Sequence, residues 1–361
     1  MSWTPKYTIT KNILTYLTKI ETVKNNFDDK PLSPVILSSL HKSAKVAQTH
    51  YSTQIEGNNL SFKQVETALY SGNKSAKDYQ GHDEKEVKAY YNAINCMEKY
   101  LEKNEPLSES FIQKIHTIIE GQKKTVPYRD GQNAIYNSTD GAIVYLPPEA
   151  KDVPALMKDL VKWVKDNINN LPTPVVAGIF HYQFVTIHPY YDGNGRTARL
   201  ITSYIMRKYG YGLKGIYSLE EYYAKNLQNY YSALETHPHH NYYYGRNDAD
   251  ITSWLEYFIK GVSEAFTNID IKATSVQNDS LTTDKTSMLR NLDIKQRKII
   301  ELFTEFKEIT SIQAGQYLGL SSQSARILLN KWVNEDFLKI VNTAKKNRTY
   351  GLSEQYEKLL F

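Results

Sequence analysis

The segment 188–199 carries the side chains of this sequence that are best suited to chemistry. Gly193 and Gly195 flank Asn194, so the backbone can turn tightly there and present several N–H groups. The helix expected to follow places the positive end of its dipole at the same point. A tight turn that leads into a helix is a suitable site for an anion such as a phosphate group.

Four side chains of the same segment supply charge and a base. Arg196 and Arg199 are three residues apart on the expected helix, so both can project from one face toward phosphate oxygens. Asp192 offers a hard oxygen ligand for Mg²⁺, which usually bridges substrate phosphates. His188, as a neutral imidazole near pH 7, can accept a proton from an attacking hydroxyl. Each part alone is more often an ordinary turn or a solvated face, but together they indicate phosphoryl or nucleotidyl transfer.

This segment resembles the motif of the Fic family, His-x-Phe-x-Asp/Glu-Gly-Asn-Gly-Arg-x-x-Arg. Members of this family mostly transfer AMP from ATP to protein hydroxyls. Tyr190 stands where Phe is usual, and its ring can occupy the same core position if the hydroxyl finds a partner. The resemblance implies that His188 deprotonates a Ser, Thr or Tyr hydroxyl of the target, and that Asp192 binds Mg²⁺ between the α- and β-phosphates. It also implies nucleotide binding by Gly193, Asn194, Gly195, Arg196, Thr197, Ala198 and Arg199.

We therefore expect a protein adenylyltransferase that uses ATP and Mg²⁺, releases pyrophosphate and also modifies itself. Two alternatives remain open. Relatives can transfer UMP or phosphocholine, so the donor could differ while the fold stays the same. A regulator from another class would sense a nucleotide without turnover and bind DNA.

Two further regions extend the resemblance. The segment 140–148 is placed like the family's flap, a hairpin whose edge strand clamps the target peptide by main-chain pairing. An ordinary structural hairpin is the alternative. Asn226, Tyr230 and Tyr231 match a region near the adenine pocket, where an aromatic face stacks on the purine and an amide reads its edge. Packing in the core is the alternative for most of these tyrosines.

The segment 52–58 matches the family's inhibitory pattern, Ser/Thr-x-x-x-Glu-Gly/Asn. The resemblance implies that Glu56 pairs with Arg199 and so prevents ATP from adopting a productive pose. A carboxylate would then compete with a phosphate for one guanidinium. The alternative is that a helix ends at Gly57 and leaves Glu56 as a surface charge. The C-terminal end of a helix dipole disfavours a carboxylate, so some partner is expected.

These residues require a mainly α-helical fold. Hydrophobic periodicity and capping residues predict helices over 35–55, 61–71, 84–103, 108–119, 153–167, 173–187, 195–209, 219–235 and 248–267. Between 128 and 148, strand-like residues on either side of Asp140-Gly141 predict a short β-hairpin. We assign 1–110 to an N-terminal helical region with the inhibitory helix, 111–267 to a Fic-type core, and the polar stretch 268–293 to a linker.

The C-terminal segment 294–361 is expected to form a domain of its own. Helices predicted at 295–306, 310–319 and 321–334, followed by strands at 337–341 and 349–352, resemble a winged helix-turn-helix. Residues 290–361 contain 12 Lys and Arg against 8 Asp and Glu. This surplus of positive charge is modest for a DNA-binding domain, so a role in packing or protein docking is favoured. DNA binding is the alternative, with contacts from the presumed recognition helix and the basic turn at Ser322, Gln323, Ser324, Arg326, Asn330, Lys345, Lys346 and Arg348.

The amino-acid composition limits the classes of protein to which this chain could belong. The chain has 361 residues, a formal charge of +5 and 41% hydrophobic residues, which is typical of a globular protein with two or more domains. Cys96 is the only cysteine, which excludes an intramolecular disulfide and multi-cysteine metal sites and fits a reducing compartment. Without a signal peptide or a long apolar run, we expect a cytoplasmic protein with no membrane segment. The 29 tyrosines leave self-modification of surface hydroxyls open, and a homodimer remains open too.

Overall fold

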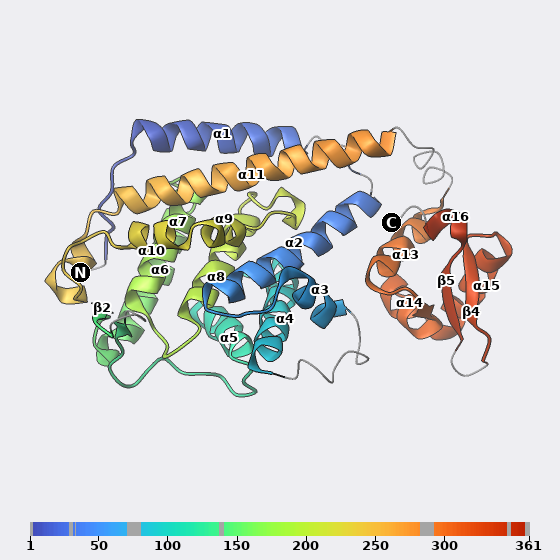
Figure 1. Ribbon diagram of the computed structural model, residues 1–361, viewed down its shortest axis with the longest axis horizontal. Coiled ribbons are helices and arrows are strands. Elements are labelled where there is room, and N and C mark those ends of the chain that lie inside the picture. The colour runs from blue at the N-terminus through green and yellow to red at the C-terminus, as the bar shows by residue number, and fades with distance from the viewer. Residues whose placement is uncertain are drawn as a thin grey trace. The chain divides into compact units, whose positions relative to one another are not determined.

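The computed structural model describes residues 3–28, 32, 34–70, 81–136, 141–281, 292–344 and 348–357. By their contacts, the residues divide into two compact units (Figure 1). The first unit combines Met1–Asp29 with Ala44–Ile269, and the second combines Lys30–Ser43 with Asp270–Phe361. The sequence placed a boundary close to residue 269, but nothing in it indicated that 30–43 belongs with the C-terminal residues.

The described part of the first unit is mainly helical, as predicted. Figure 1 shows helix α1 lying beside the first part of α11, and the Thr10 hydroxyl before α1 donates a hydrogen bond to Glu256 of α11. Helix α1 was missed as a separate element within the expected helical region. The helices are α1 (Lys11–Asp28), α2 (Pro34–Ile55), α3 (Phe62–Tyr70), α4 (His82–Glu102), α5 (Glu109–Ile119), α6 (Val153–Asn167), α7 (Thr173–Ile187), α8 (Asn194–Lys208), α9 (Glu220–Lys225), α10 (Leu227–Leu234) and α11 (Thr252–Leu281).

Short 3₁₀ turns connect several of these helices: η2 (Ala150–Asp152), η3 (Leu213–Gly215), η4 (Tyr242–Tyr244) and η5 (Arg246–Asp248). The helix predicted over 219–235 is interrupted at Asn226, which has the extended backbone φ of −146° and caps α10. Among the described residues, no helix combines the length and the apolar character that crossing a bilayer demands.

Helix α7 lies at the centre of the first unit, and nearly all of its residues are buried. An apolar sequence with no polar face is typical of a helix that is surrounded by others. Gly178 lets α7 approach α11 closely, because a Cβ there would lie 2.8 Å from Cδ1 of Phe258 and 3.0 Å from Cδ2 of Leu255. The indole N–H of Trp254 donates to the Gly178 carbonyl oxygen at 2.8 Å. This packing fixes the helix whose C-terminal end carries His188.

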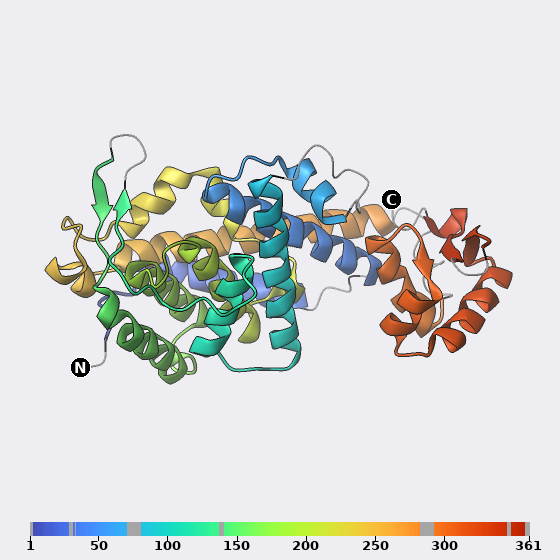
Figure 2. The same ribbon diagram turned by 90° about the horizontal axis from the view of Figure 1, so that it is seen from below.

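A small antiparallel hairpin interrupts the helices, as predicted for this region. Strand β1 (Ile135–Tyr136) pairs with β2 (Ile143–Tyr145), with Ile135 opposite Tyr145. Figure 2 shows both strands projecting beyond the neighbouring helices. The Tyr145 hydroxyl donates to the Thr186 carbonyl oxygen at 2.6 Å, so the base of the hairpin is attached to the end of α7. Residues 137–140, including Asp140 of the expected turn, lie outside the described residues.

Helix α11 corrects the predicted linker 268–293, because it continues to Leu281. The polar composition is compatible with a helix here, since hydroxyl groups bond back to the preceding turn. Thr267 Oγ1 donates to the Ser263 carbonyl oxygen at 2.7 Å, and Thr274 Oγ1 donates to that of Asp270 at 2.8 Å. Ala273 is fully buried. The part of the predicted linker at 282–291 lies outside the described residues.

The C-terminal residues contain the elements expected of a winged helix-turn-helix at the predicted positions. Thr310 forms a capping box with Gln313 at the start of α14, and Gly319 ends that helix with φ 67°. The indole of Trp332 is fully buried in the core between the helices and the sheet. A short strand β3 and a short helix α16 were not predicted. The elements are α13 (Ile294–Glu305), β3 (Ile309–Thr310), α14 (Ser311–Leu318), α15 (Ser322–Asn334), β4 (Leu338–Asn342), β5 (Thr349–Leu352) and α16 (Glu354–Glu357), with strand order β3-β5-β4.

Replacing Gly178 with Ala tests whether the close packing of α7 against α11 contributes to the stability of the protein. Alanine is the better helix former, but its Cβ would collide with Phe258 and Leu255. We expect the free energy of unfolding in urea to fall by about 1–3 kcal/mol. Gly81→Ala is the control, because a Cβ at Gly81 meets nothing within 4 Å, and its effect should stay within about 0.5 kcal/mol. A Gly178→Ala variant as stable as the parent would contradict this account of the packing.

Candidate active site

His188 lies at the point where α7 ends, in a left-handed backbone conformation with φ 50° and ψ 60°. This conformation is uncommon for a residue other than glycine and is held here by surrounding bonds. The ring Nδ1–H donates to the Val185 carbonyl oxygen at 3.3 Å, so the neutral ring keeps its lone pair on Nε2. Burial lowers the pKa of His188 to about 4, against a weaker opposing effect of that hydrogen bond. The imidazole is therefore a neutral base at physiological pH.

Arg129 holds the backbone around His188 in place. Its Nε donates to the His188 carbonyl oxygen at 2.9 Å, and its Nη1 donates to that of Gly131 at 3.0 Å. Nη2 donates to the Pro148 carbonyl oxygen, and the main-chain N–H donates to that of Pro189 at 2.9 Å. The buried guanidinium thus joins the loop after α7 to both ends of the hairpin. No pattern in the sequence marked this residue.

The turn after His188 is closed by the side chain of Asn194. Its Oδ1 accepts the Tyr190 N–H at 3.0 Å, and its Nδ2 donates to the Tyr190 carbonyl oxygen at 2.8 Å. The amide therefore shapes the turn instead of facing an anion. The Tyr190 ring stacks on His116, with centroids 3.5 Å apart and planes 9° apart. Its buried hydroxyl has no hydrogen-bond partner among the described residues, so the partner expected for this substitution is not found.

The predicted ion pair between Arg199 and Glu56 is present. Nη2 of Arg199 lies 2.7 Å from Oε1 of Glu56, and the arginine side chain is only 1% exposed. Nε donates to Oγ of Ser52 at 2.9 Å, and Nη2 also donates to the Ser52 carbonyl oxygen at 2.8 Å. Burial alone would lower the pKa of Arg199, but the Glu56 carboxylate raises it above its usual range. Nε and Nη2 of the guanidinium are therefore both engaged by the segment 52–58.

The backbone at the end of α2 explains where Glu56 stands. Gly57 has φ 97°, its N–H donates to the Gln54 carbonyl oxygen at 3.0 Å, and the Asn58 N–H donates to that of Thr53 at 3.1 Å. This pair of bonds is a Schellman cap, which ends the helix at Glu56. Oε1 of Glu56 lies so close to Gly195 that a Cβ there would collide with it. The carboxylate thus reaches the first turn of α8, where unpaired N–H groups and the helix dipole favour an anion.

Arg196 lies beside the turn, where carboxylates surround its guanidinium. Its Nη1 donates to Oε1 of Glu86 at 2.6 Å, and its Nη2 donates to Oε1 of Glu120 at 3.2 Å. Asp192 Oδ1 lies 3.4 Å from the same Nη2 and accepts the Gly193 N–H at 2.6 Å. The Asp192 side chain remains 77% exposed, whereas that of Arg196 is 7% exposed. Asp192 is therefore open to a ligand, and Arg196 is bound by carboxylates that the sequence analysis missed.

The other predicted nucleotide-binding residues of α8 belong to the core. Thr197 is buried, and its Oγ1 is hydrogen-bonded to Nδ1 of His116 at 3.1 Å. Ala198 is fully buried. Gly193 has φ 69°, and a Cβ at this position would collide with Oε1 of Glu120. Position 193 therefore requires glycine both for its backbone conformation and for the approach of α5.

The predicted adenine-pocket residues have separate surroundings. Asn226 Oδ1 accepts the Asn229 N–H at 3.1 Å and so caps α10. Tyr230 is buried, and its hydroxyl is hydrogen-bonded to Nε2 of His181 at 2.9 Å, which is a core contact. Tyr231 is exposed, and its hydroxyl donates to the Ile55 carbonyl oxygen at 3.4 Å, next to Glu56. Of these three residues, Tyr231 is the one whose ring is accessible beside the segment 52–58.

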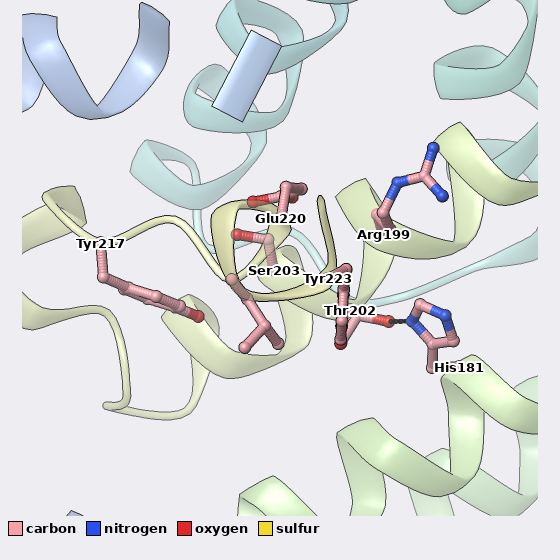
Figure 3. Close-up of a pocket in the computed structure, with 8 residues that line it drawn as sticks. His181, Arg199, Thr202, Ser203, Tyr217, Glu220 and Tyr223 are labelled. Carbon is pink, nitrogen blue, oxygen red and sulfur yellow. Dashed lines mark hydrogen bonds between the residues drawn. The ribbon is translucent and has the colours of Figure 1, made fainter. Parts of the chain in front are cut away.

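A small pocket lies beside Arg199 in the interior of the first unit (Figure 3). Glu220 is buried in its wall, where its carboxylate accepts hydrogen bonds from Gln48 Nε2 at 3.1 Å and Ser218 Oγ at 2.9 Å. Burial raises the pKa of this carboxyl group. Figure 3 also shows the hydrogen bond between His181 and Thr202, which is 3.2 Å long. The pocket is lined by His181, Arg199, Thr202, Ser203, Tyr217, Leu219, Glu220 and Tyr223.

The side chains proposed for DNA contact are only partly available. Ser322, Gln323, Ser324 and Arg326 are exposed on α15. Asn330 instead accepts a hydrogen bond from the Tyr350 hydroxyl at 3.0 Å. Arg348 is half-buried, and Lys345 and Lys346 lie outside the described residues. DNA binding by this segment stays a prediction.

Comparison with known proteins agrees with the motif. Residues 106–206 match the Fic/DOC family. Residues 106–206 are therefore similar to a Fic domain. This match includes His188, Asp192 and both arginines of the turn, whereas Glu56 and Asn226 lie outside it.

Curated relatives carry the same domain. The protein adenylyltransferase fic-1 of Caenorhabditis elegans is 32% identical over 180 residues, which cover 48% of this chain and 34% of that protein. The protein adenylyltransferase Fic of Drosophila erecta is 25% identical over 293 residues, which cover 76% of this chain and 53% of that protein. The chain thus spans between a third and about half of the length of these relatives.

Solved structures share the fold. A Fic family protein from Desulfovibrio desulfuricans aligns with a TM-score of 0.61 and 24% identity, over 98% of this chain and 99% of that chain. The Fic-1 structure from C. elegans aligns with a TM-score of 0.55 and 22% identity, over 72% of this chain and 71% of that chain. These similarities support the Fic-type helical core and its hairpin.

Two buried histidines next to the site make stability depend on pH. Burial lowers the pKa values of His116 and His181 to about 3, below the value of about 6.5 in an unfolded chain. The unfolded state therefore binds more protons below about pH 6.5, so stability is complete above that pH and falls as the pH decreases toward 3. Each histidine contributes up to about 1.4 kcal/mol per pH unit.

We expect the free energy of urea unfolding to decrease between about pH 7 and about pH 5, with a smaller slope in a His116→Gln variant. The lost slope should correspond to about one proton. His82→Gln is the control, because the His82 side chain is 91% exposed and should leave the slope unchanged. An equal slope in the parent and in His116→Gln would refute the assignment.

Proposed function

We propose that this protein is an adenylyltransferase that moves AMP from ATP to a Ser, Thr or Tyr hydroxyl of a protein, its own included. The observation that carries the proposal is the placement of a neutral, half-buried His188 at one end of a glycine turn that opens helix α8. The names of the curated relatives support the same reaction. A DNA-binding regulator that only senses a nucleotide remains the alternative.

Each step of the AMP transfer is assigned to particular residues. The Nε2 lone pair of His188 takes the proton of the target hydroxyl, whose oxygen attacks the α-phosphorus of ATP. The bond from the α-phosphorus to the oxygen bridging it to the β-phosphate breaks, and pyrophosphate leaves. The main-chain N–H of Gly195, together with Arg199, binds phosphate oxygens at the start of α8, and the N–H of Gly193 joins them when Asp192 turns from it to the cation. Holding both reactants in line provides much of the rate acceleration.

A divalent cation fits the exposed carboxylate of Asp192. Mg²⁺ is usually held by one or two carboxylates together with substrate phosphates and water, and the side chain of Asp192 is 77% exposed beside the turn. When bound there, Mg²⁺ would neutralise negative charge on the phosphates. Arg196 and its partners Glu86 and Glu120 shape the surroundings of this carboxylate, because Arg196 also lies within 3.4 Å of it.

Glu56 acts as an inhibitor in this proposal. Its carboxylate occupies Arg199 and lies against Gly195, which are the groups that a phosphate of ATP requires. Breaking the pair leaves the buried guanidinium without a counterion, so the inhibited state persists until another anion replaces Glu56. The protein with Glu56 in place should therefore transfer AMP only slowly.

Labelled ATP with Mg²⁺ tests the proposal directly. Glu56→Gly should raise incorporation of label into the protein itself by at least about tenfold, which corresponds to about 1.4 kcal/mol. Adding His188→Ala should reduce the rate by about a hundredfold or more while ATP still binds, because only the base is lost. Gln54→Ala is the matched control, since it removes an exposed side chain from the same helix end and leaves both the helix and the ion pair in place.

An equal increase in Gln54→Ala would assign the effect to a general change at the helix end and not to the Glu56 carboxylate. No label in Glu56→Gly, with ATP, with UTP or with a mixture of candidate acceptor proteins, would reject the transferase. Nucleotide binding without transfer would then favour the sensing regulator.

The pH profile of the Glu56→Gly variant tests the base. Because burial lowers the pKa of His188 to about 4, the ring is unprotonated across the neutral range and the rate should not fall until the pH approaches 5. A decrease centred near pH 6.5 would contradict this assignment. Each sample should regain full activity when it is returned to neutral pH, which separates protonation of the base from acid unfolding.

A further inference from the structure

We propose that the inhibitory segment 52–58 has a second, buried anchor: the Glu86 carboxylate joins Asn58 to Arg196 and thereby sets where Glu56 stands. The inference rests on the proposed function, because it concerns the control of the same transfer. It assigns positioning roles to Asn58 and Glu86, which the inhibitory motif itself does not use.

One carboxylate makes both contacts. Oε1 of Glu86 accepts a hydrogen bond from Nη1 of Arg196 at 2.6 Å, and Oε2 accepts one from Nδ2 of Asn58 at 2.7 Å. The side chains of Glu86 and Arg196 are 9% and 7% exposed, and Asn58 is buried. Buried hydrogen bonds to charged groups are costly to leave unmade. Helix α4 therefore connects the end of α2 to the first turn of α8.

Asn58 is fixed by both ends of its side-chain amide and by its main-chain N–H. Its Nδ2 also donates to the Asp83 carbonyl oxygen at 3.0 Å, and its Oδ1 accepts the Leu60 N–H at 3.1 Å. Its main-chain N–H closes the cap of α2 on the Thr53 carbonyl oxygen. Glu56 lies inside this cap, two residues before Asn58. The direction in which Glu56 leaves the backbone is therefore determined by a residue that is itself held on α4.

The ion pair between Glu56 and Arg199 is weaker than the contacts that Glu86 makes with Asn58 and Arg196. The Glu56 side chain is 31% exposed, and a partly exposed carboxylate is subject to competition from water and salt. The Asn58–Glu86–Arg196 contacts are shielded from both. A loosened anchor should free Glu56 from Arg199 even though both residues of the pair are still present.

A matched control exists on the same helix. Glu98 of α4 also joins α2 to α8, because Oε2 accepts from Nζ of Lys45 at 2.7 Å and Oε1 accepts from Nη2 of Arg207 at 3.3 Å. Its side chain is 17% exposed. The two carboxylates thus link the same three helices, but only Glu86 does so at the residues next to Glu56.

The experiment measures self-modification with labelled ATP in variants of the whole protein. Asn58→Ala removes the bond to Glu86 and leaves the Glu86–Arg196 pair intact, and it should raise the rate by up to about tenfold. Asn58→Asp keeps the acceptor for Leu60 N–H but places a carboxylate against Glu86, and it should raise the rate at least as much. Glu98→Gln should leave the rate at the parent value.

Combination with Glu56→Gly separates positioning from general damage. If Asn58 acts through Glu56, then Asn58→Ala added to Glu56→Gly should leave the rate of Glu56→Gly unchanged. A merely structural role would lower the rate of the double variant. Hydrogen exchange gives a second measurement, in which Asn58→Ala should increase exchange at the Gly57 and Asn58 amides and Glu98→Gln should not.

The outcomes distinguish this inference from the proposed function. Activation by Glu56→Gly without activation by either Asn58 variant would overturn the anchor and leave the transferase intact. No activity in any variant would reject the transferase, and unchanged exchange at Gly57 and Asn58 in Asn58→Ala would then overturn the anchor on its own. Faster exchange would support the anchor even in that case.

Discussion

The N-terminal end of helix α8 carries a positive electrostatic potential that needs a negative partner. The first unit is organised around this need. Unpaired N–H groups, a helix dipole and the guanidinium of Arg199 create positive potential at one buried point. Burying Arg199 without a counterion would be costly, so a carboxylate must approach it whenever no other anion is present. The Schellman cap of α2, the bare Cα of Gly195 and the hydrogen bonds from Ser52 all serve that approach.

The same region shows how burial and backbone geometry prepare a base. The left-handed conformation of His188 directs its carbonyl oxygen to Arg129, while the ring N–H is occupied by Val185. Arg129 also reaches the carbonyl oxygens at both ends of the hairpin, so a change in the hairpin base is transmitted to the backbone of His188. Polar groups that form no part of the motif therefore determine how its central residue is presented.

Local patterns in the sequence predicted most helices, the hairpin and the Glu56–Arg199 pair. Those patterns depend on neighbours along the chain or on one short motif. Glu86, Glu120 and Arg129 were missed because their partners are distant in sequence and no fixed spacing marks them. The linker expected from 268 was wrong as far as Leu281, since serine and threonine hydroxyls bonded back to the helix instead of interrupting it. The pairing of Arg196 with Glu86 and Glu120 was not predicted, because both carboxylates come from distant parts of the chain.

Helix α4 contacts α2 and α8 through two carboxylates that are about 18 Å apart along its axis, at a rise of about 1.5 Å per residue. A helix attached at one point can swing about that point, but attachment at two separated points removes this rotational freedom. Helix α2 is therefore unable to move away from α8 as a rigid rod while both attachments persist. Glu56 can then withdraw by rotation of its side chain or by unwinding of the last turn of α2, and unwinding increases chain entropy and becomes more favourable as temperature rises.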